Sequence, residues 1–240
     1  MSVETFMDAE ERQRLINQYA EIAALAGGLA HEIKNPLSTI LLNLELLTEE
    51  LGGGDSPRDR RMLKKVQTVQ RECHHLERIL EEFLKFARVG ELDLVETDFN
   101  QAVREFIEFY QPEAAAQGVE ISPHLGPDLP PVRLDGPLFR QALLNLALNA
   151  QQAMPRGGLL ELQTGCRDGR VLLDLIDTGS GIDEAAQSQI FQIFYSTKPG
   201  GSGLGLPTVK KIIEAHGGRI TVDSEPGRGT RFTISLPAFG

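Results

Sequence analysis

The chain has 240 residues, 41% hydrophobic and 24% charged, which suits one or two soluble domains with a real core. Its net charge of -10 argues against a nucleic-acid backbone as the main partner, because proteins that bind nucleic acids usually carry a basic face. Cys73 and Cys166 lie far apart and have neither disulfide-framework nor zinc-ligand spacing, which favours a reduced, cytoplasmic setting.

The first residues, MSVETFMDAEERQRL, are acidic and polar, so they do not form a signal peptide. No stretch reaches the roughly 18 consecutive apolar residues of a membrane span. We therefore expect a cytoplasmic chain that makes no direct membrane contact. Whether it is the cytoplasmic part of a membrane-bound or larger sensor stays open.

Two long helical patterns come first in the chain. The first has apolar residues at spacings of three, four or seven, namely Ile22, Leu25, Leu29, Ile33, Ile40, Leu44, Leu47 and Leu51. The second is nearly a strict heptad, formed by Met62, Val66, Val69, Cys73, Leu76, Leu80 and Phe83. The short connection GGGDSPRD predicts an antiparallel hairpin. Because one hairpin exposes much apolar surface, we expect a homodimer with a four-helix bundle.

From about Glu91, short strands and helices alternate and glycine becomes frequent. The predicted strands are 93–99, 118–124, 131–135, 159–165, 170–177, 218–224 and 230–236. The predicted helices are 99–117, 136–154, 183–190 and 204–216, the last of which ends at two glycines. The fold class is therefore multi-domain: an all-α hairpin followed by an α+β domain with a largely antiparallel or mixed sheet.

His31 lies in the segment GGLAHEIKNPLSTI of the first helical pattern. At about 100° per residue it lies about 200° from the apolar Leu29 and Ile33, so it faces solvent. A neutral imidazole is a nucleophile near pH 7, and Glu32 can orient it or accept its proton. Asn35, one turn later, can position a water or a phosphoryl oxygen. The alternative is an ordinary solvated histidine.

The remaining histidines have no comparable surroundings in sequence. His74 and His75 lie in the heptad helix and are interpreted as solvated or as flanking the bundle. His124 and His216 are interpreted as ordinary too; His216 ends a predicted helix, where a cation suits the helix dipole.

The predicted helix 136–154 has an apolar face and an amide-rich face. The apolar face consists of Phe139, Leu143, Leu146, Ala150 and Ala153, and the amide face of Gln141, Asn145, Asn149 and Gln152. Amides at i and i+4 lie side by side, and Mg²⁺ accepts oxygen ligands while keeping waters and substrate phosphates. Asn149, with Asn145, can thus hold a metal against a triphosphate; the alternative is a neutral polar face.

Two glycine-rich segments follow. In VLLDLIDTGSGID a strand runs into a loop, where Asp177 is an acceptor for an exocyclic amine and the glycines allow close backbone approach. In FYSTKPGGSGLGLPTV the glycines precede a helix, whose free N–H groups suit a phosphate, and Lys198 can reach one from a mobile lid. Neither a P-loop nor a Rossmann fingerprint is present, so this is a different kind of nucleotide site. The alternatives are a tight turn and a functionless surface loop.

In their order, these features resemble the sequence boxes of sensor histidine kinases. The resemblance runs from about Gln18 to Leu236, and HEIKNPL together with DTGSGI and GSGLGL is highly specific. The segments HEIKNPLSTI, LLNLALNAQQAM and IFQIFYSTK look most like the nitrogen-regulation type of kinase.

The resemblance implies a linker helix over 1–17, a dimerisation and histidine phosphotransfer domain over 18–90, and an ATP-binding domain over 91–240. The latter would be the α+β sandwich of the GHKL (Bergerat) fold, shared with gyrase, mismatch-repair and heat-shock chaperone ATPases. The implied activity is that of a protein-histidine kinase. ATP would phosphorylate His31, the phosphoryl group would pass to an Asp of a response regulator receiver domain, and phosphatase activity on that partner would accompany it. Residues 85–91 would be the hinge.

The resemblance also implies individual roles. His31 would be the phosphoacceptor, Glu32 would assist autophosphorylation and Asn35 would serve the phosphatase activity. Asn149 would carry Mg²⁺ with Asn145 nearby, and Asp177 would bind the adenine amino group of ATP. The other implied ATP-binding residues are Gly179, Gly181, Lys198, Gly203, Leu204, Gly205 and Thr230.

One departure concerns the residues after the Asn149–Ala150 pair. Many family members carry a basic and then an aromatic residue there, whereas this chain has Gln151-Gln152-Ala153, so the side chain that steadies the phosphates is left open. Two other functions remain as alternatives: an ATPase-type conformational machine of the same nucleotide fold, and a non-catalytic dimeric scaffold. The first would need a hydrolysis base near the asparagine helix, which the sequence does not offer.

Overall fold

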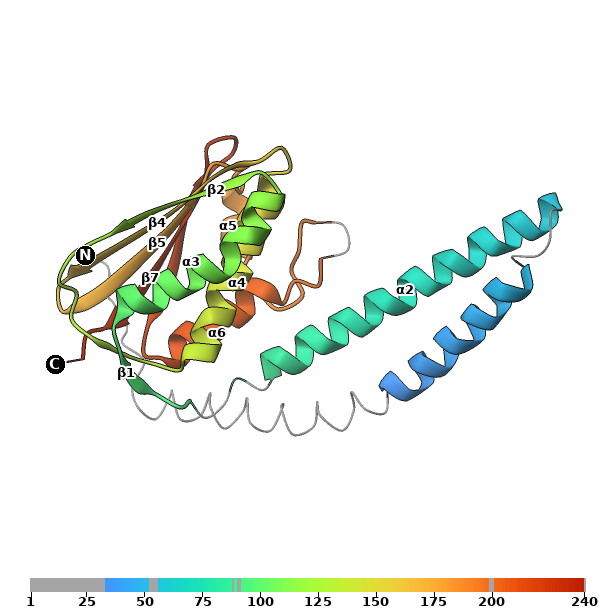
Figure 1. Ribbon diagram of the computed structural model, residues 1–240, viewed down its shortest axis with the longest axis horizontal. Helices are drawn as coiled ribbons and strands as arrows, with labels where there is room; N and C mark the ends of the chain where they lie inside the picture. The colour runs from blue at the N-terminus through green and yellow to red at the C-terminus, as the bar shows by residue number, and fades with distance from the viewer. Residues whose placement is uncertain (1–32, 52–55, 88, 90–91, 199–200, 240) are drawn as a thin grey trace. The chain divides into compact units, whose positions relative to one another are not determined.

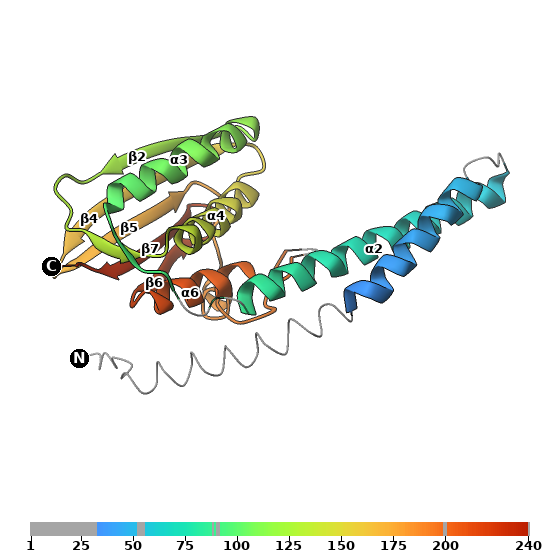
Figure 2. The ribbon, with the colours of Figure 1, turned by 60° about the horizontal axis from the view of Figure 1, so that its bottom comes forward.

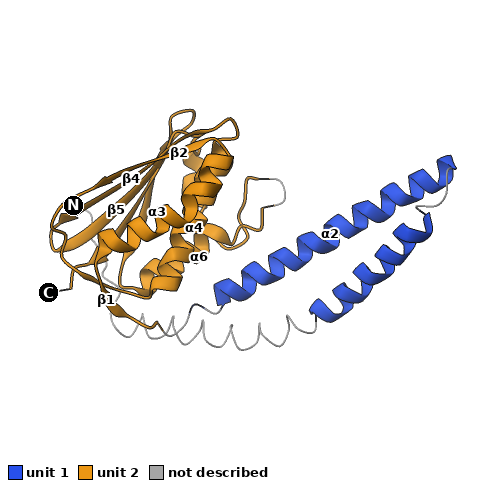
Figure 3. Ribbon diagram, viewed as in Figure 1, with its two compact units in different colours: residues 1–90 blue, residues 91–240 orange. Residues whose placement is uncertain are grey.

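The computed structural model describes residues 33–51, 56–87, 89, 92–198 and 201–239. The chain forms two compact units, residues 1–90 and 91–240 (Figure 3). The predicted linker helix 1–17, His31 and Glu32 lie outside the described residues.

The described residues of the first unit form two helices, residues 33–51 and α2 (Pro57–Ala87), which run side by side in both ribbon views (Figures 1 and 2). The sequence SPRD explains where α2 begins. The Ser56 hydroxyl accepts the Asp59 N–H at 3.1 Å and donates to the Asp59 carboxylate at 2.7 Å, and Pro57 occupies the first turn, where no N–H is needed. The end of α2 at Ala87 falls within the predicted hinge, where residues 88, 90 and 91 lie outside the described part.

The helices of the first unit are antiparallel, as expected. Lys34 Nζ lies 3.5 Å from Glu81 Oε1, whereas further along the first helix Leu37 and Leu41 form a buried cluster with Cys73. Several other apolar side chains of these helices, such as Ile40 and Val69, are exposed. Among the described residues, no helix combines the length and the apolar character that crossing a membrane requires.

The second unit contains a five-stranded sheet with the order β2-β4-β5-β7-β6. Its strands are β2 (Val119–Leu125), β4 (Gly158–Arg167), β5 (Arg170–Asp177), β6 (Arg219–Glu225) and β7 (Gly229–Pro237). Strands β2 and β4 are parallel and the other pairs antiparallel, so the sheet is mixed, as predicted. A separate antiparallel pair joins β1 (Val95–Thr97) to β3 (Val132–Leu134).

The helices of this unit cover one face of the sheet (Figure 2). They are α3 (Phe99–Ala116), α4 (Gly136–Ala153), α5 (Glu184–Gln187) and α6 (Gly205–Ala215). Aspartates cap the first three: Asp98, Asp135 and Asp183 each accept a backbone N–H of the first turn. Strand β5 alternates strictly between buried and half-buried residues, and the predicted apolar face of α4 is buried at Phe139, Leu143 and Leu146. The core therefore lies between this helix layer and the sheet.

His216, which ends α6, corrects one expectation. It is buried, its Nε2 accepts the Asp135 N–H at 3.0 Å, and its Nδ1 lies 2.8 Å from the Ile212 carbonyl, to which it must donate. Burial lowers the pKa of the imidazole, against smaller opposing contributions from Ile212 and Asp135. His216 is therefore a neutral link between α6 and the start of α4, and the interpretation as a cation at a helix end is wrong.

Candidate functional site

The amide face of α4 is directed toward the first residue of α6 and the segment that precedes it. Asn145 Nδ2 donates to the Gly205 carbonyl at 3.3 Å, so its amide nitrogen holds α6 against α4. Asn149, one turn later, has its Oδ1 at 3.4 Å from Lys198 Nζ. The two amides therefore do different things: Asn145 is used in packing, whereas the oxygen of Asn149 faces a cation.

Lys198 reaches α4 from a segment 46 residues further along the chain. Its ammonium donates to Gln152 Oε1 at 2.7 Å as well as lying near Asn149. Partial burial lowers the pKa of Lys198, and the nearby Asp177 carboxylate opposes that change. An ammonium thus lies between two amide oxygens and within the field of a carboxylate.

Asp177 ends β5 and is buried, with 5% of its surface exposed. Its Oδ1 accepts the Gly179 N–H at 2.8 Å, and it lies opposite Thr230 in the sheet. Burial raises the pKa of the carboxyl, and hydrogen bonds from the backbone of Gly179 and Thr230, followed by the charge of Lys198, oppose the rise. Asp177 is thus a buried, oriented acceptor, which suits recognition of a donor such as an exocyclic amine.

The loop after Asp177 is fixed by contacts that leave no room for a side chain at Gly179 or Gly181. A Cβ at Gly179 would lie 2.6 Å from the Cβ of Ala153 on α4. Gly181 has φ +69°, and a Cβ there would lie 2.2 Å from the Glu225 carbonyl oxygen. The loop that follows Asp177 therefore packs closely between α4 and the β6–β7 turn.

The glycine before α6 and the one that begins it differ from each other. Gly203 has φ +70°, and a Cβ there would lie 2.5 Å from the carbonyl carbon of Phe194, whose N–H donates to Gly203 at 3.1 Å. Leu204 is buried and precedes the first turn of α6, which has no side-chain cap. A Cβ at Gly205 would meet nothing within 4 Å. Packing therefore requires Gly203 but not Gly205.

Thr230 belongs to a network that sequence reasoning missed. Its hydroxyl lies 3.0 Å from Ser224 Oγ, which accepts the Ile182 N–H at 2.9 Å.

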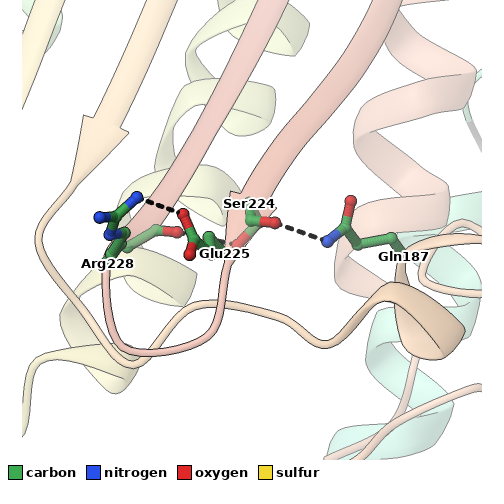
Figure 4. A network of polar contacts seen from close by, with 5 residues as sticks. Gln187, Ser224, Glu225 and Arg228 are labelled. Atoms are coloured by element: carbon green, nitrogen blue, oxygen red, sulfur yellow. Dashed lines mark hydrogen bonds and ion pairs between the residues drawn. The ribbon is translucent and has the colours of Figure 1, made fainter.

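Figure 4 shows Gln187 reaching the Ser224 carbonyl, at 2.8 Å, and Arg228 paired with Glu225 at 2.7 Å across the turn. These contacts hold the loop after Asp177 to the β6–β7 hairpin. Nothing in the local sequence around Ser224 or Gln187 predicts them.

Asn35 is the candidate residue of the first unit that lies within the described part of the chain. Asn35 lies on the helix of residues 33–51, with an exposed side chain, and its carbonyl accepts the Thr39 hydroxyl at 3.1 Å. The predicted phosphoacceptor His31 and its neighbour Glu32 lie outside the described residues.

The structure brings the predicted residues of the second unit to one end of the sheet. A buried acceptor, an amide oxygen and a lysine lie together beside glycines that let backbone approach a ligand. Such a set can bind the polar edge of a base at Asp177 and charged oxygens near Lys198, a combination suited to a nucleotide.

Two family models match the chain. Residues 21–92 match the His Kinase A (phospho-acceptor) domain, and residues 134–239 match the histidine kinase-, DNA gyrase B- and HSP90-like ATPase. Together they cover most of the chain, one on each structural unit.

Curated relatives are histidine kinases. The sensor histidine kinase ZraS of Klebsiella oxytoca is 35% identical over 217 residues, which are 90% of this chain and 46% of that protein. The signal transduction histidine-protein kinase AtoS of Escherichia coli (strain K12) is 31% identical over 231 residues, 96% of this chain and 37% of that protein. The chain thus spans less than half the length of these relatives.

Solved structures agree in fold. Full-length ShkA in complex with AMPPNP aligns with a TM-score of 0.68 at 31% identity, over 90% of this chain and 46% of that one. The histidine kinase ThkA in complex with the response regulator protein TrrA aligns with a TM-score of 0.66 at 24% identity, over 99% of this chain and 68% of that one. The predicted succession of a helical region and a mixed α/β ATPase domain is confirmed. The chain therefore combines a region of the His Kinase A (phospho-acceptor) domain family, residues 21–92, with a region of the histidine kinase-, DNA gyrase B- and HSP90-like ATPase family, residues 134–239.

Proposed function

We propose that this chain is the kinase core of a sensor histidine kinase, with residues 18–90 as the phosphotransfer domain and 91–240 as the catalytic domain. ATP bound by the second unit phosphorylates His31, and the phosphoryl group then passes to an Asp of a response regulator receiver domain. The observation that carries the proposal is the grouping of Asn149, Lys198 and Asp177 at one end of the sheet, within a domain that matches the ATPase family.

In this proposal the second unit binds and orients ATP. The Asp177 carboxylate accepts the adenine amino group, a role that its burial and its bond from Gly179 support. Lys198 faces the terminal phosphates. The other residues of the binding surface are Asn145, Gly179, Gly181, Gly203, Leu204, Gly205 and Thr230. Phosphoryl transfer depends mainly on such positioning and on charge neutralisation.

Asn149 is the proposed ligand of Mg²⁺. Its Oδ1 already faces a cation, the Lys198 ammonium at 3.4 Å, so the residues present fit a metal ion at this oxygen. Mg²⁺ commonly uses one or two protein oxygens together with waters and substrate phosphates, and it would neutralise charge on the phosphates. The chain contributes the oriented amide oxygen.

The proposed acceptor chemistry lies on the first unit. A ring nitrogen of His31 forms a bond to the γ-phosphorus, the bond from that phosphorus to the bridging oxygen breaks, and ADP leaves with the electron pair. Glu32 takes the proton of the imidazole. In the proposed phosphatase activity, Asn35 positions a water that attacks the phosphorus on the partner's Asp; the bond from that phosphorus to the aspartyl oxygen breaks and inorganic phosphate leaves. The exposed Asn35 side chain supports access.

Exposed apolar residues support a homodimer. Ile33, Ile40 and Leu47 recur every seven residues with 42%, 45% and 43% of their surface exposed. On α2, Met62, Val69 and Leu76 form a second stripe of the same period with 47%, 46% and 52% exposed. A second copy that packs its own stripes against these would bury both in a four-helix bundle.

A response regulator receiver domain is the proposed partner. ThkA, whose fold this chain shares, is known in complex with the response regulator TrrA. A cytoplasmic location suits that partner. Assignment to the nitrogen-regulation subgroup stays a prediction that rests on the segments HEIKNPLSTI, LLNLALNAQQAM and IFQIFYSTK. The names of the relatives ZraS and AtoS do not indicate that subgroup.

The decisive experiment incubates the whole chain with Mg²⁺ and γ-labelled ATP and follows acid-labile, base-stable label. We expect His31→Gln to remove the label and His74→Gln, a matched substitution on α2, to leave it. Full labelling of His31→Gln would refute the phosphoacceptor assignment. ATP hydrolysis without any protein label would instead favour a conformational ATPase, and absence of nucleotide binding would favour a scaffold.

Asn149→Asp tests the site itself, because it replaces the neutral amide that faces the cation with a carboxylate close to the phosphates. We expect it to abolish labelling while the dimer, which depends on the other unit, persists in sedimentation. Normal labelling would contradict the metal assignment.

A further inference from the structure

We propose that Gln152 is a positioning residue for Lys198: its side-chain carbonyl fixes the ammonium beside Asn149, so that the cation facing the terminal phosphates comes from a segment outside α4. This inference rests on the proposed function, since it concerns how the same site handles ATP.

The geometry makes Gln152 the main anchor of the lysine. The Lys198 ammonium lies 2.7 Å from Gln152 Oε1 but 3.4 Å from Asn149 Oδ1. Asn149 and Gln152 are three residues apart on α4, so their side chains lie on one face and can contact one ammonium. An ammonium has three donors, and a bond to Gln152 leaves two for other acceptors.

The chemistry of the Gln152 amide and the Lys198 ammonium also fits a positioning role. An amide carbonyl orients an ammonium without cancelling its charge, whereas a carboxylate at residue 152 would neutralise the lysine and repel phosphate. A lysine or arginine there would repel Lys198. The residues that follow Asn149 and Ala150, Gln151 and Gln152, are both uncharged, so the charge has to come from another segment.

The neighbouring glutamine is engaged elsewhere. Gln151 Oε1 accepts a hydrogen bond from the hydroxyl of the buried Tyr110, which belongs to α3 and not to the segment of Lys198. The two glutamines thus have separate duties, one within the core against α3 and one at the site. Of the two glutamines that follow Asn149 and Ala150, Gln152 is therefore the one that acts near the phosphates.

Gln152 also keeps Lys198 and a metal ion from competing for the same oxygen, Asn149 Oδ1. If Asn149 Oδ1 were the only anchor of Lys198, binding of a metal ion at that oxygen would release the lysine. With the shorter bond to Gln152, Lys198 keeps its place when Asn149 turns to a metal. We therefore expect Gln152 to matter for ligands that carry the terminal phosphate and not for those that lack it.

The test compares Gln152→Leu, Lys198→Gln and the double variant in the whole chain. ATP and ADP affinities are measured by calorimetry without metal, and labelling by γ-labelled ATP is measured with Mg²⁺. Loss of one charge-assisted hydrogen bond corresponds to roughly a tenfold change in affinity. We expect each single variant to bind ATP about tenfold more weakly while its ADP affinity changes less than about twofold.

The double variant is expected to be no weaker than Lys198→Gln alone, because Gln152 acts through the lysine. Gln141→Leu is the matched control: it is the same substitution on the same helix face, about 16 Å earlier along the axis, and it should leave both affinities unchanged. Additive losses in the double variant, or an equal loss of ADP affinity in Gln152→Leu, would overturn the inference. Failure of the wild-type chain to bind ATP at all would instead refute the proposed function.

Discussion

The two units of this chain bury their apolar residues to different degrees. In the second unit, Phe139, Leu143 and Ile234 are at most 2% exposed, and the helix layer closes over the sheet. In the first, Leu37, Leu41 and Cys73 are buried, but residues at the same helical period, such as Ile40 and Val69, keep close to half their surface exposed. The second unit thus has a complete core of its own, whereas the described helices of the first unit leave two apolar stripes exposed, which the proposed dimer would cover. The difference predicts that concentration affects only the stability of the first unit.

The largest expected effect lies in the core of the second unit. Phe139→Ala removes a ring that packs 5.5 Å, between centroids, from Phe99, and we expect a loss of about 3–5 kcal/mol in the free energy of unfolding. Thermal unfolding at two protein concentrations should give the same loss. Phe109→Ala is the control, because 56% of that ring is exposed, and it should cost far less. A loss for Phe139→Ala that varied with concentration would contradict the comparison.

A smaller effect is expected on the stripe of α2. Val69→Asp places a carboxylate where the proposed dimer buries an apolar side chain, at a cost of about 1–3 kcal/mol per protomer. Sedimentation should show a shift from dimer to monomer while ATP affinity stays unchanged, because the second unit is complete alone. Gln67→Asp adds the same charge two residues earlier, off the stripe, and should leave the dimer intact. A dimer that survives Val69→Asp would mean that another surface joins the copies.

The smallest effect concerns the pH dependence of the second unit. Burial lowers the pKa of His216 below its ordinary value, so the neutral form stabilises the fold above about pH 6.5 and this contribution is lost as pH falls through the lower pKa of the folded state. Wild type should therefore lose stability relative to His216→Gln on acidification from pH 7 to 5, as denaturant unfolding would report. His124→Gln, at an exposed position, should follow wild type. If the free energies of unfolding of wild type and His216→Gln changed with pH in parallel, protonation of this imidazole would not be coupled to unfolding.

Much of the fold could be predicted because the signals are local. Aspartates before α3 and α4 accept first-turn N–H groups, and the alternation in β5 shows which residues face the core. The candidate site was also recognisable in part, since Asn149 and Asp177 stand in short motifs whose residue types suit a nucleotide. The relatives support the nucleotide-binding domain, whereas the role of each residue remains a prediction.

Other features could not be read from local pattern. Ser224 and Gln187, which hold the loop after Asp177, are ordinary polar residues until the β6–β7 hairpin places them together. His216 was misjudged because a position at a helix end indicates neither burial nor a bond to the start of α4, 81 residues earlier.

By itself the sequence determined the helix starts, the strands and the residue types available for chemistry, because caps, periodicity and glycine turns act over a few residues. Only the tertiary structure decided which of those residues meet. The bond from Lys198 to Gln152 joins positions 46 residues apart, and the burial of Asp177 depends on the strands and turns around it. Hydrogen bonding and desolvation depend on distances through space, and the order of strands and the packing of α4 and α6 set those distances.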